Sequence, residues 1–265
     1  MEVQPLTDAF GLAVTDIDLS APLSDDDETS LRQLFAARSL LLFREQTLSH
    51  DDQRRFVTTL GPVSTALLPP ATDGETQTGF YLSNESGDGQ GELQPHSDHC
   101  FLDQPLWGIS LYAQAAPEHG GQTTFTSAVA ACRNLPTDLE RSLAGRDAVH
   151  SYVARERLGD DLRDPNLPDT LSAQHPVIWE HPVTGAPVLY VNPWMTRQIV
   201  GVSPDESQTL LAVLLSYLAD PSISYRHTWH RGDFIVWDNI ALLHARTTND
   251  PRQARLLYRL QQGLP

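Results

Sequence analysis

Apolar and polar residues follow two periods along this chain, and the change of period separates predicted strands from predicted helices. Apolar runs of strand length occur at 40–43, 177–179, 188–191, 225–229, 234–237, 241–244 and 256–260. Helical spacing follows capping residues, which predicts helices that begin near Ser24, Ser49, Thr137 and Ser203. This mixture of short strands and helices does not specify a topology by itself.

Composition narrows the class of protein. The chain has 265 residues, of which 40% are hydrophobic and 20% are charged, as is ordinary for a globular protein. No apolar run approaches the about 18 residues that span a bilayer, and no repeat or linker divides the chain, so we expect one domain over 1–265. The net charge of -16 repels phosphate backbones and anionic lipid, which argues against nucleic-acid and membrane partners. Homo-oligomer formation is left open.

The cysteines and the start of the chain bear on the cellular compartment. Cys100 and Cys132 are too few for a disulfide framework or a cysteine-rich zinc site, so we expect both to be small buried residues. The first twenty residues carry Asp8, Asp16 and Asp18 and lack the basic start and apolar stretch of a secretory signal. We therefore expect a cytoplasmic protein.

The segment His96-Ser97-Asp98 is the first candidate for chemistry. Side chains on a strand alternate between two faces, so His96 and Asp98 are predicted to share one face. With His244 they supply two imidazoles and one carboxylate, the facial set that holds non-haem Fe(II) and leaves positions open for O2 and a co-substrate. The same residues also suit a zinc hydrolase, in which an open position holds activated water. We expect the other eight of the ten histidines to be surface or hydrogen-bonded core residues.

The spacing around His244 is more specific than the triplet. Arg255 follows His244 by eleven residues and Arg259 follows it by fifteen. Further segments of note are 237–246, which contains His244, then Gly120-Gly121-Gln122-Thr123, and 40–46 near the start. Together these features resemble the Fe(II)- and 2-oxoglutarate-dependent dioxygenases of the taurine/2,4-dichlorophenoxyacetate family. The likeness covers nearly the whole chain.

The resemblance implies both a fold and a set of reactants. The fold is α+β with a mainly β core, a double-stranded β-helix (distorted jelly roll) with flanking helices. Fe(II) would be bound by His96, Asp98 and His244, with 2-oxoglutarate and O2 as co-substrates. Arg255 would bind the distal carboxylate of 2-oxoglutarate, helped by the Thr123 hydroxyl, because an arginine fork matches a carboxylate. A zinc hydrolase has no need of that pair.

Two segments are expected to border the site. Residues 67–91 are rich in Pro, Gly, Thr, Asp and Ser, which predicts a long surface loop. Such a loop beside a metal site is often a substrate lid, and a disordered loop without a function is the alternative. Residues 145–171 are expected to form an insertion over the mouth of the fold.

Arg259 and Glu92 are the candidates for substrate binding. By resemblance Arg259 helps to bind the acidic group of the substrate, and an ordinary salt bridge is the competing interpretation. The chain departs from the taurine pattern, because the loop before Tyr81 lacks a sulfonate-binding histidine and Glu92 replaces an asparagine. Glu92 could accept an amine, or it could be a solvated loop carboxylate. We therefore expect a small organic acid or amino-acid-like metabolite rather than taurine.

The resemblance also implies a reaction. The enzyme would oxidise an unactivated C–H bond of its small-molecule substrate, most simply by hydroxylation, and release succinate and CO2. Desaturation or ring formation would need only another pose of the substrate. A non-catalytic metal-binding relative is the further alternative, and the joint presence of the triad, Thr123 and Arg255 argues against it.

Overall fold

The computed structural model describes residues 1–66, 78–84, 91–153 and 170–265, and most of its strands lie in two sheets. The larger sheet has seven strands in the order β1-β2-β3-β14-β6-β16-β4. They are β1 Glu2–Pro5, β2 Leu12–Thr15, β3 Leu40–Phe43, β14 Phe234–Asp238, β6 Gly108–Ala115, β16 Leu256–Gln262 and β4 Gly79–Ser83. The second sheet has the order β13-β7-β15-β5. Its strands are β13 Ser224–His227, β7 Thr123–Ser127, β15 Leu242–Arg246 and β5 Leu93–His96.

Two smaller sheets lie at one side of the molecule. Three strands form one of them in the order β12-β8-β9, and β10 and β11 form a hairpin. The strands are β8 Asp147–Val153, β9 Thr170–Pro176, β10 Ile178–Glu180, β11 Pro187–Leu189 and β12 Thr196–Ile199. The hairpin joins the two apolar runs at 177–179 and 188–191.

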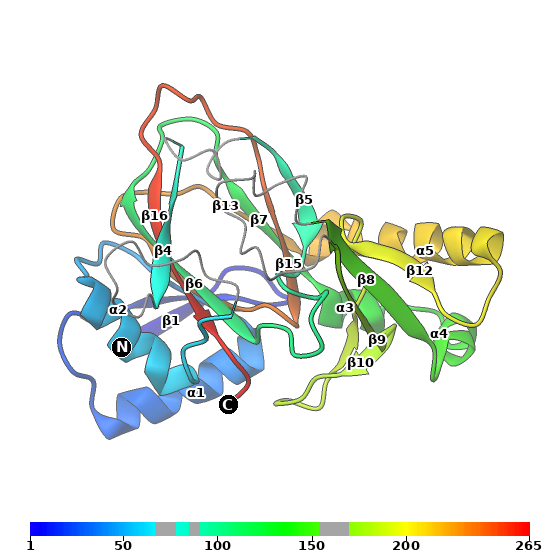
Figure 1. Cartoon of the computed structure of the whole chain (residues 1–265). Coiled ribbons are helices and arrows are strands. Elements are labelled where there is room, and N and C mark those ends of the chain that lie inside the picture. Colours follow the sequence, from blue (N-terminus) through cyan, green and yellow to red (C-terminus); the bar gives the residue numbers. More distant parts are fainter. Residues whose placement is uncertain (67–77, 85–90, 154–169) are drawn as a thin grey trace.

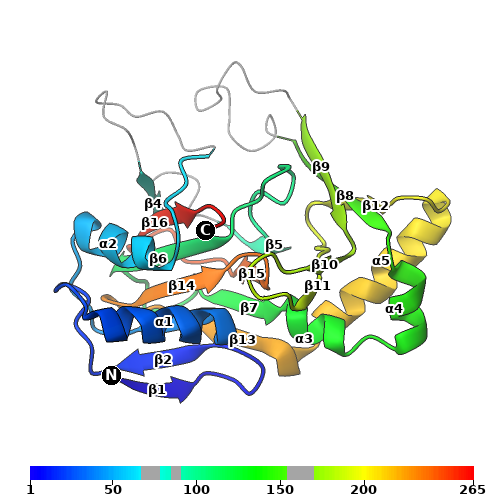
Figure 2. The same cartoon turned by 90° about the horizontal axis from the view of Figure 1, so that it is seen from below.

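The main helices begin where the capping residues predict. The Ser24 side chain accepts from the Asp27 N–H at the start of α1 (Asp25–Arg38). Ser49 and Asp52 form a reciprocal capping box on α2 (His50–Leu60), and Ser203 caps α5 (Pro204–Leu218). The short helices are α3 Ala128–Arg133, α4 Thr137–Leu143 and the 3-10 helix η2 Pro221–Ile223. Figures 1 and 2 show α1 and α2 beside the seven-stranded sheet, and α4 and α5 at the far end with β8, β9 and β12.

Both segments that were expected to border the site contain regular structure. Within 67–91, residues 79–83 form the edge strand β4, which pairs antiparallel with β16. Within 145–171, residues 147–153 form β8, which pairs with β9 along its full length. For the first segment, ladder hydrogen bonds to the distant strand β16 therefore override a loop-like composition. Residues 67–77, 85–90 and 154–169 lie outside the described residues, so the lid and the insertion stay predictions.

An apolar layer joins the two main sheets. Phe125 of β7 and Trp237 of β14 are both buried, and their rings meet edge to face with centroids 5.2 Å apart. Leu42, Leu111 and Leu242 belong to the same buried cluster. Cys100 and Cys132 are buried and unpaired, as expected. Across the described part of the chain, no helix has the length and apolar character that a membrane crossing requires.

Candidate metal and co-substrate site

The two histidines of the predicted triad are direct neighbours across the four-stranded sheet. His96 on β5 pairs in register with His244 on β15, so both side chains project from the same face. His96 Nε2 lies 3.1 Å from Asp98 Oδ1, and His244 Nε2 lies 3.5 Å from Asp98 Oδ2. All three ligand atoms lie within 4.8 Å of one another, which is close enough to share one metal ion.

Asp98 lies in a turn and not on the strand that the residue pattern predicts. β5 ends at His96, where its ladder with β15 also ends, and Asp98 lies in the turn that follows. The next residue, His99, has φ 58°, in the left-handed region that reverses the chain. The expectation that His96 and Asp98 share a strand face was therefore wrong. A turn at the end of an edge strand brings the carboxylate to the imidazoles.

The protonation states of the triad suit a divalent cation. His96 Nδ1 lies 2.7 Å from the Gln94 carbonyl oxygen, which can only accept, so the Nε2 atom of a neutral His96 carries the lone pair. Burial, with His96 nearby, lowers the pKa of His244 to about 4 and keeps that ring neutral near neutral pH. Burial raises the pKa of Asp98, but the charge of Arg259 and the contacts with His244 and His96 together hold that pKa well below its usual value.

Arg255 is a buried cation with no carboxylate partner among the described residues. It is 2% exposed, yet its Nε and Nη1 atoms have no hydrogen-bond partner. Burial, with the charge of Arg246 as a second cause, lowers the pKa of Arg255 to about 9. Because an uncompensated buried charge costs free energy, this arrangement is that of a site that binds an anion.

The Gly-Gly-Gln-Thr segment packs directly against Arg255. Gly121 has φ 60°, and a Cβ atom there would lie 3.1 Å from Arg255 Cδ and 3.2 Å from its Nε. Gly120 has φ 76°, and a Cβ atom there would lie only 2.6 Å from the Thr248 carbonyl oxygen. Thr123, two residues after Gly121, begins β7, where it pairs with Arg246 of β15. The structure thus brings the predicted co-substrate residues into one neighbourhood.

Two residues that the sequence analysis did not single out position this pair. Trp229 Nε1 donates to Thr123 Oγ1 at 2.9 Å, which leaves the hydroxyl hydrogen for another acceptor. Asn84 binds both backbone polar groups of Arg255. Its side-chain Oδ1 accepts from Arg255 N at 3.0 Å, and its backbone N–H donates to Arg255 O at 3.3 Å. Neither residue stands in a recognisable motif, so only the tertiary contacts identify them.

The two candidate substrate residues take different positions. Arg259 Nη1 donates to Asp98 Oδ2 at 2.6 Å and Nη2 donates to Gln261 Oε1 at 2.8 Å, so the salt bridge considered as an alternative is present. Its Nε is buried without a partner. Glu92 is exposed ahead of β5 and makes no hydrogen bond or ion pair with the triad or Arg259 in the described part of the chain.

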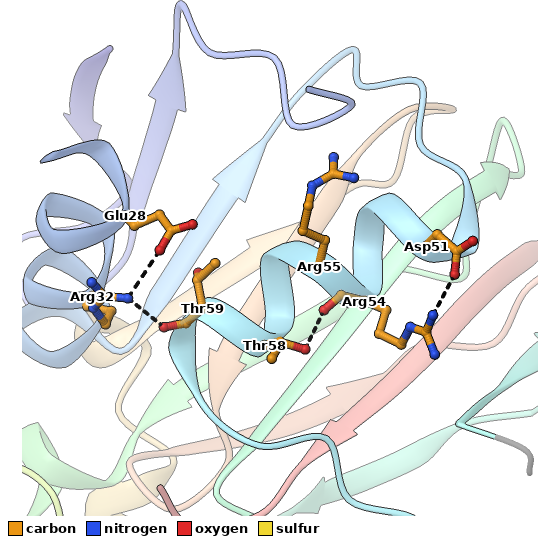
Figure 3. Close-up of a pocket in the computed structure, with 7 residues that line it drawn as sticks. All are labelled: Glu28, Arg32, Asp51, Arg54, Arg55, Thr58 and Thr59. Atoms are coloured by element: carbon orange, nitrogen blue, oxygen red, sulfur yellow. Dashed lines mark hydrogen bonds and ion pairs between the residues drawn. The ribbon is translucent and has the colours of Figure 1, made fainter. Parts of the chain in front are cut away.

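A surface groove of about 830 Å³ lies elsewhere, between α1 and α2 (Figure 3). It is lined by Glu28, Arg32, Asp51, Arg54, Arg55, Thr58 and Thr59. Arg32 pairs with Glu28 at 3.5 Å, and Arg54 pairs with Asp51 at 2.8 Å. The groove contains no triad residue, and these paired arginines contrast with Arg255, whose Nε and Nη1 lack a partner in the described part of the chain.

Comparisons with known proteins agree with this geometry. The sequence model described as "Taurine catabolism dioxygenase TauD, TfdA family" matches residues 2–261. The chain is 28% identical to the (S)-phenoxypropionate/alpha-ketoglutarate-dioxygenase of Sphingobium herbicidovorans, over 97% of this chain and 93% of that protein. It is 30% identical to the alpha-ketoglutarate-dependent 2,4-dichlorophenoxyacetate dioxygenase of Cupriavidus pinatubonensis, over 96% and 95%.

A solved structure supports the same relationship. The crystal structure of a taurine dioxygenase from Burkholderia xenovorans superimposes with a TM-score of 0.84 at 27% identity, covering 100% of this chain and 89% of that one. The chain therefore belongs to the TauD, TfdA family and is an Fe(II)- and 2-oxoglutarate-dependent dioxygenase.

Proposed function

We propose that His96, Asp98 and His244 hold the Fe(II), and that Arg255 and Thr123 bind the distal carboxylate of 2-oxoglutarate. The observation that carries this proposal is that Arg255 is buried and that its Nε and Nη1 have no partner among the described residues. The triad alone would also suit zinc, but a hydrolytic zinc site has no need of such a cation. Bound Fe(II) supplies the activation of O2, and the co-substrate leaves as succinate and CO2.

The residues of the chain hold and orient the reactants. His96 presents its Nε2 to the metal because its Nδ1 is tied to the Gln94 carbonyl. Thr123 donates its hydroxyl hydrogen to the co-substrate because Trp229 already donates to its oxygen. Arg255 supplies a charge-assisted fork to the same distal carboxylate. Fixing this end leaves the orientation of the co-substrate at the metal little freedom.

We also propose that the substrate is a small organic acid, oxidised at an unactivated C–H bond, most simply by hydroxylation. Arg259 Nη1 lies 2.6 Å from Asp98, so an anion bound to the remaining N–H groups of Arg259 would lie beside the metal ligands. The ring of Phe80 lies 5.4 Å from this guanidinium and offers an apolar surface next to it. Phenoxypropionate and 2,4-dichlorophenoxyacetate, for which two relatives are named, are carboxylic acids of this kind. Glu92 has no described contact that supports an amine site.

We infer that the two main sheets form a double-stranded β-helix within one domain. Consecutive strands alternate between the sheets, since β5 and β7 lie in the four-stranded sheet and β6 lies in the other. The same alternation recurs from β13 to β16. A cytoplasmic location remains a prediction of the sequence, and the oligomeric state remains open.

The proposal is tested by metal-ligand variants and a substrate screen. Anaerobic Fe(II) with 2-oxoglutarate should give a visible charge-transfer band, and succinate release should be screened across aryloxy acids, sulfonates and amino-acid derivatives. His96→Ala and His244→Ala should abolish both signals because no neighbour replaces the lost ligand. His119→Ala, at an exposed histidine, is the matched control and should behave as wild type. A colourless complex, or substantial succinate release by either ligand variant, would overturn the assignment.

A further inference from the structure

Asn239 holds the backbone of Asp98 on both sides. Its Oδ1 accepts a hydrogen bond from Asp98 N at 2.9 Å, and its Nδ2 donates to Asp98 O at 2.9 Å. The same Nδ2 donates to Leu106 O at 3.0 Å. Asn239 is completely buried, so the amide group is satisfied entirely by these protein groups.

Asp98 needs such support because it lies outside the sheet. A residue within a sheet has its N–H and C=O groups held by a neighbouring strand. The β5–β15 ladder ends at His96, and the chain then turns through the left-handed residue His99. The amide of Asn239 takes the place of the missing strand and fixes both peptide groups of Asp98.

Asn239 is itself anchored through the residue before it. Asp238 Oδ1 accepts from two backbone N–H groups of the following turn, at 3.0 and 2.9 Å. Asp238 Oδ2 accepts from Trp107 Nε1 at 3.1 Å and lies 2.8 Å from His181 Nε2. All of these groups are buried. The turn between β14 and β15, which leads to His244, therefore has a fixed conformation.

We propose that Asn239 is a positioning residue of the metal site, which sets the place of Asp98 relative to His244. Asn239 joins the turn that carries Asp98 to the turn that leads into β15, the strand of His244. The two bonded residues are 141 positions apart in the sequence. The inference rests on the proposed assignment of His96, Asp98 and His244 as metal ligands. Loss of the amide would let the Asp98 carboxylate leave its place and would weaken metal binding.

Titration of Mn(II) into the metal-free protein, followed by calorimetry under anaerobic conditions, tests this inference. Asn239→Ala should weaken Mn(II) binding by roughly 10- to 100-fold, the usual effect of removing a group that orients a metal ligand. Asn239→Leu refills the volume without restoring the hydrogen bonds, so it should bind Mn(II) as weakly as Asn239→Ala. Wild-type Mn(II) affinity in the leucine variant would show that only packing matters and would overturn the proposal.

Gln53→Ala is the matched control for a general loss of stability. Gln53 is also a completely buried amide, and it donates to Ser110 Oγ at 3.0 Å and Tyr258 O at 3.3 Å in the seven-stranded sheet. It should lower the Tm of the metal-free protein but leave Mn(II) affinity at the wild-type value. If Asn239→Ala behaves in the same way, Asn239 is merely structural and the proposal fails.

The outcome also separates this inference from the proposed function. Unchanged Mn(II) affinity in folded Asn239→Ala, with binding lost in His96→Ala, would overturn the positioning role alone. Wild-type protein that binds no Mn(II), or His96→Ala that binds it normally, would overturn the ligand assignment and the positioning role together. Circular dichroism at low temperature establishes that each variant is folded before the titration.

Discussion

Arg255→Met is expected to stabilise the free protein while it destroys the co-substrate site. Arg255 is 2% exposed, two of its side-chain nitrogens have no partner among the described residues, and burial lowers its pKa to about 9. At about 1.4 kcal/mol per pKa unit, the folded protein carries a penalty of roughly a few kcal/mol for this charge. The penalty is complete at neutral pH, where the group is charged in both the folded and unfolded chain, and it fades as pH rises above about 9. Methionine keeps the apolar contact with Gly121 and buries no charge.

Co-substrate binding should change in the opposite direction. A hydrogen bond to a charged group contributes about 1.5–3 kcal/mol, so the variant should lose roughly ten- to more than hundredfold in affinity for 2-oxoglutarate. With Mn(II) present, N-oxalylglycine at about 100 times its Kd should stabilise the wild-type protein by about 2.7 kcal/mol. At the same ligand concentration, Arg255→Met should show little of that gain.

Thermal unfolding with and without Mn(II) and N-oxalylglycine measures both effects. A change of 1 kcal/mol shifts Tm by roughly 2–4 °C in a domain of about this size, so a rise of several degrees is expected for the free variant. Arg252→Met is the matched control, because Arg252 is exposed and pairs with Asp250 at 2.7 Å in the turn just before Arg255. It should leave both measurements unchanged. A lower Tm for free Arg255→Met, or a ligand shift equal to that of wild type, would refute the reasoning.

Three further predictions concern neighbouring features of the site. Gly121→Ala places a Cβ atom 3.1 Å from Arg255 Cδ on a backbone with φ 60°, so calorimetry should show weaker 2-oxoglutarate binding and unchanged Mn(II) affinity. Equal losses of 2-oxoglutarate and Mn(II) affinity would indicate a general structural defect. Arg259→Ala should impair substrate-dependent succinate release far more than 2-oxoglutarate binding, and equal impairment would make Arg259 a structural partner of Arg255. Affinity for 2-oxoglutarate should fall as pH rises through about 9, because free Arg255 then loses its proton; an affinity that stays constant well above that pH would contradict this role.

Interactions close in sequence determined the helix starts and the chemical nature of the site. Ser24 and Ser49 bond to N–H groups three residues ahead, so the starts of α1 and α2 follow from a few adjacent residues. The choice of two imidazoles, a carboxylate and a distant arginine likewise belongs to the residue types themselves. The family resemblance that these residues and their spacing carry therefore predicts the metal and the co-substrate from the sequence.

Contacts between distant segments decided how those residues meet. Strand alternation placed Asp98 on the face of His96, but the ladder ends at His96, two residues before Asp98, and a turn held by Asn239 follows. The sequence also could not tell whether Arg259 would find a carboxylate, or that Arg255 would be buried without one among the described residues. Each outcome depends on the register and separation of strands far apart in the chain, which no local pattern of residues encodes.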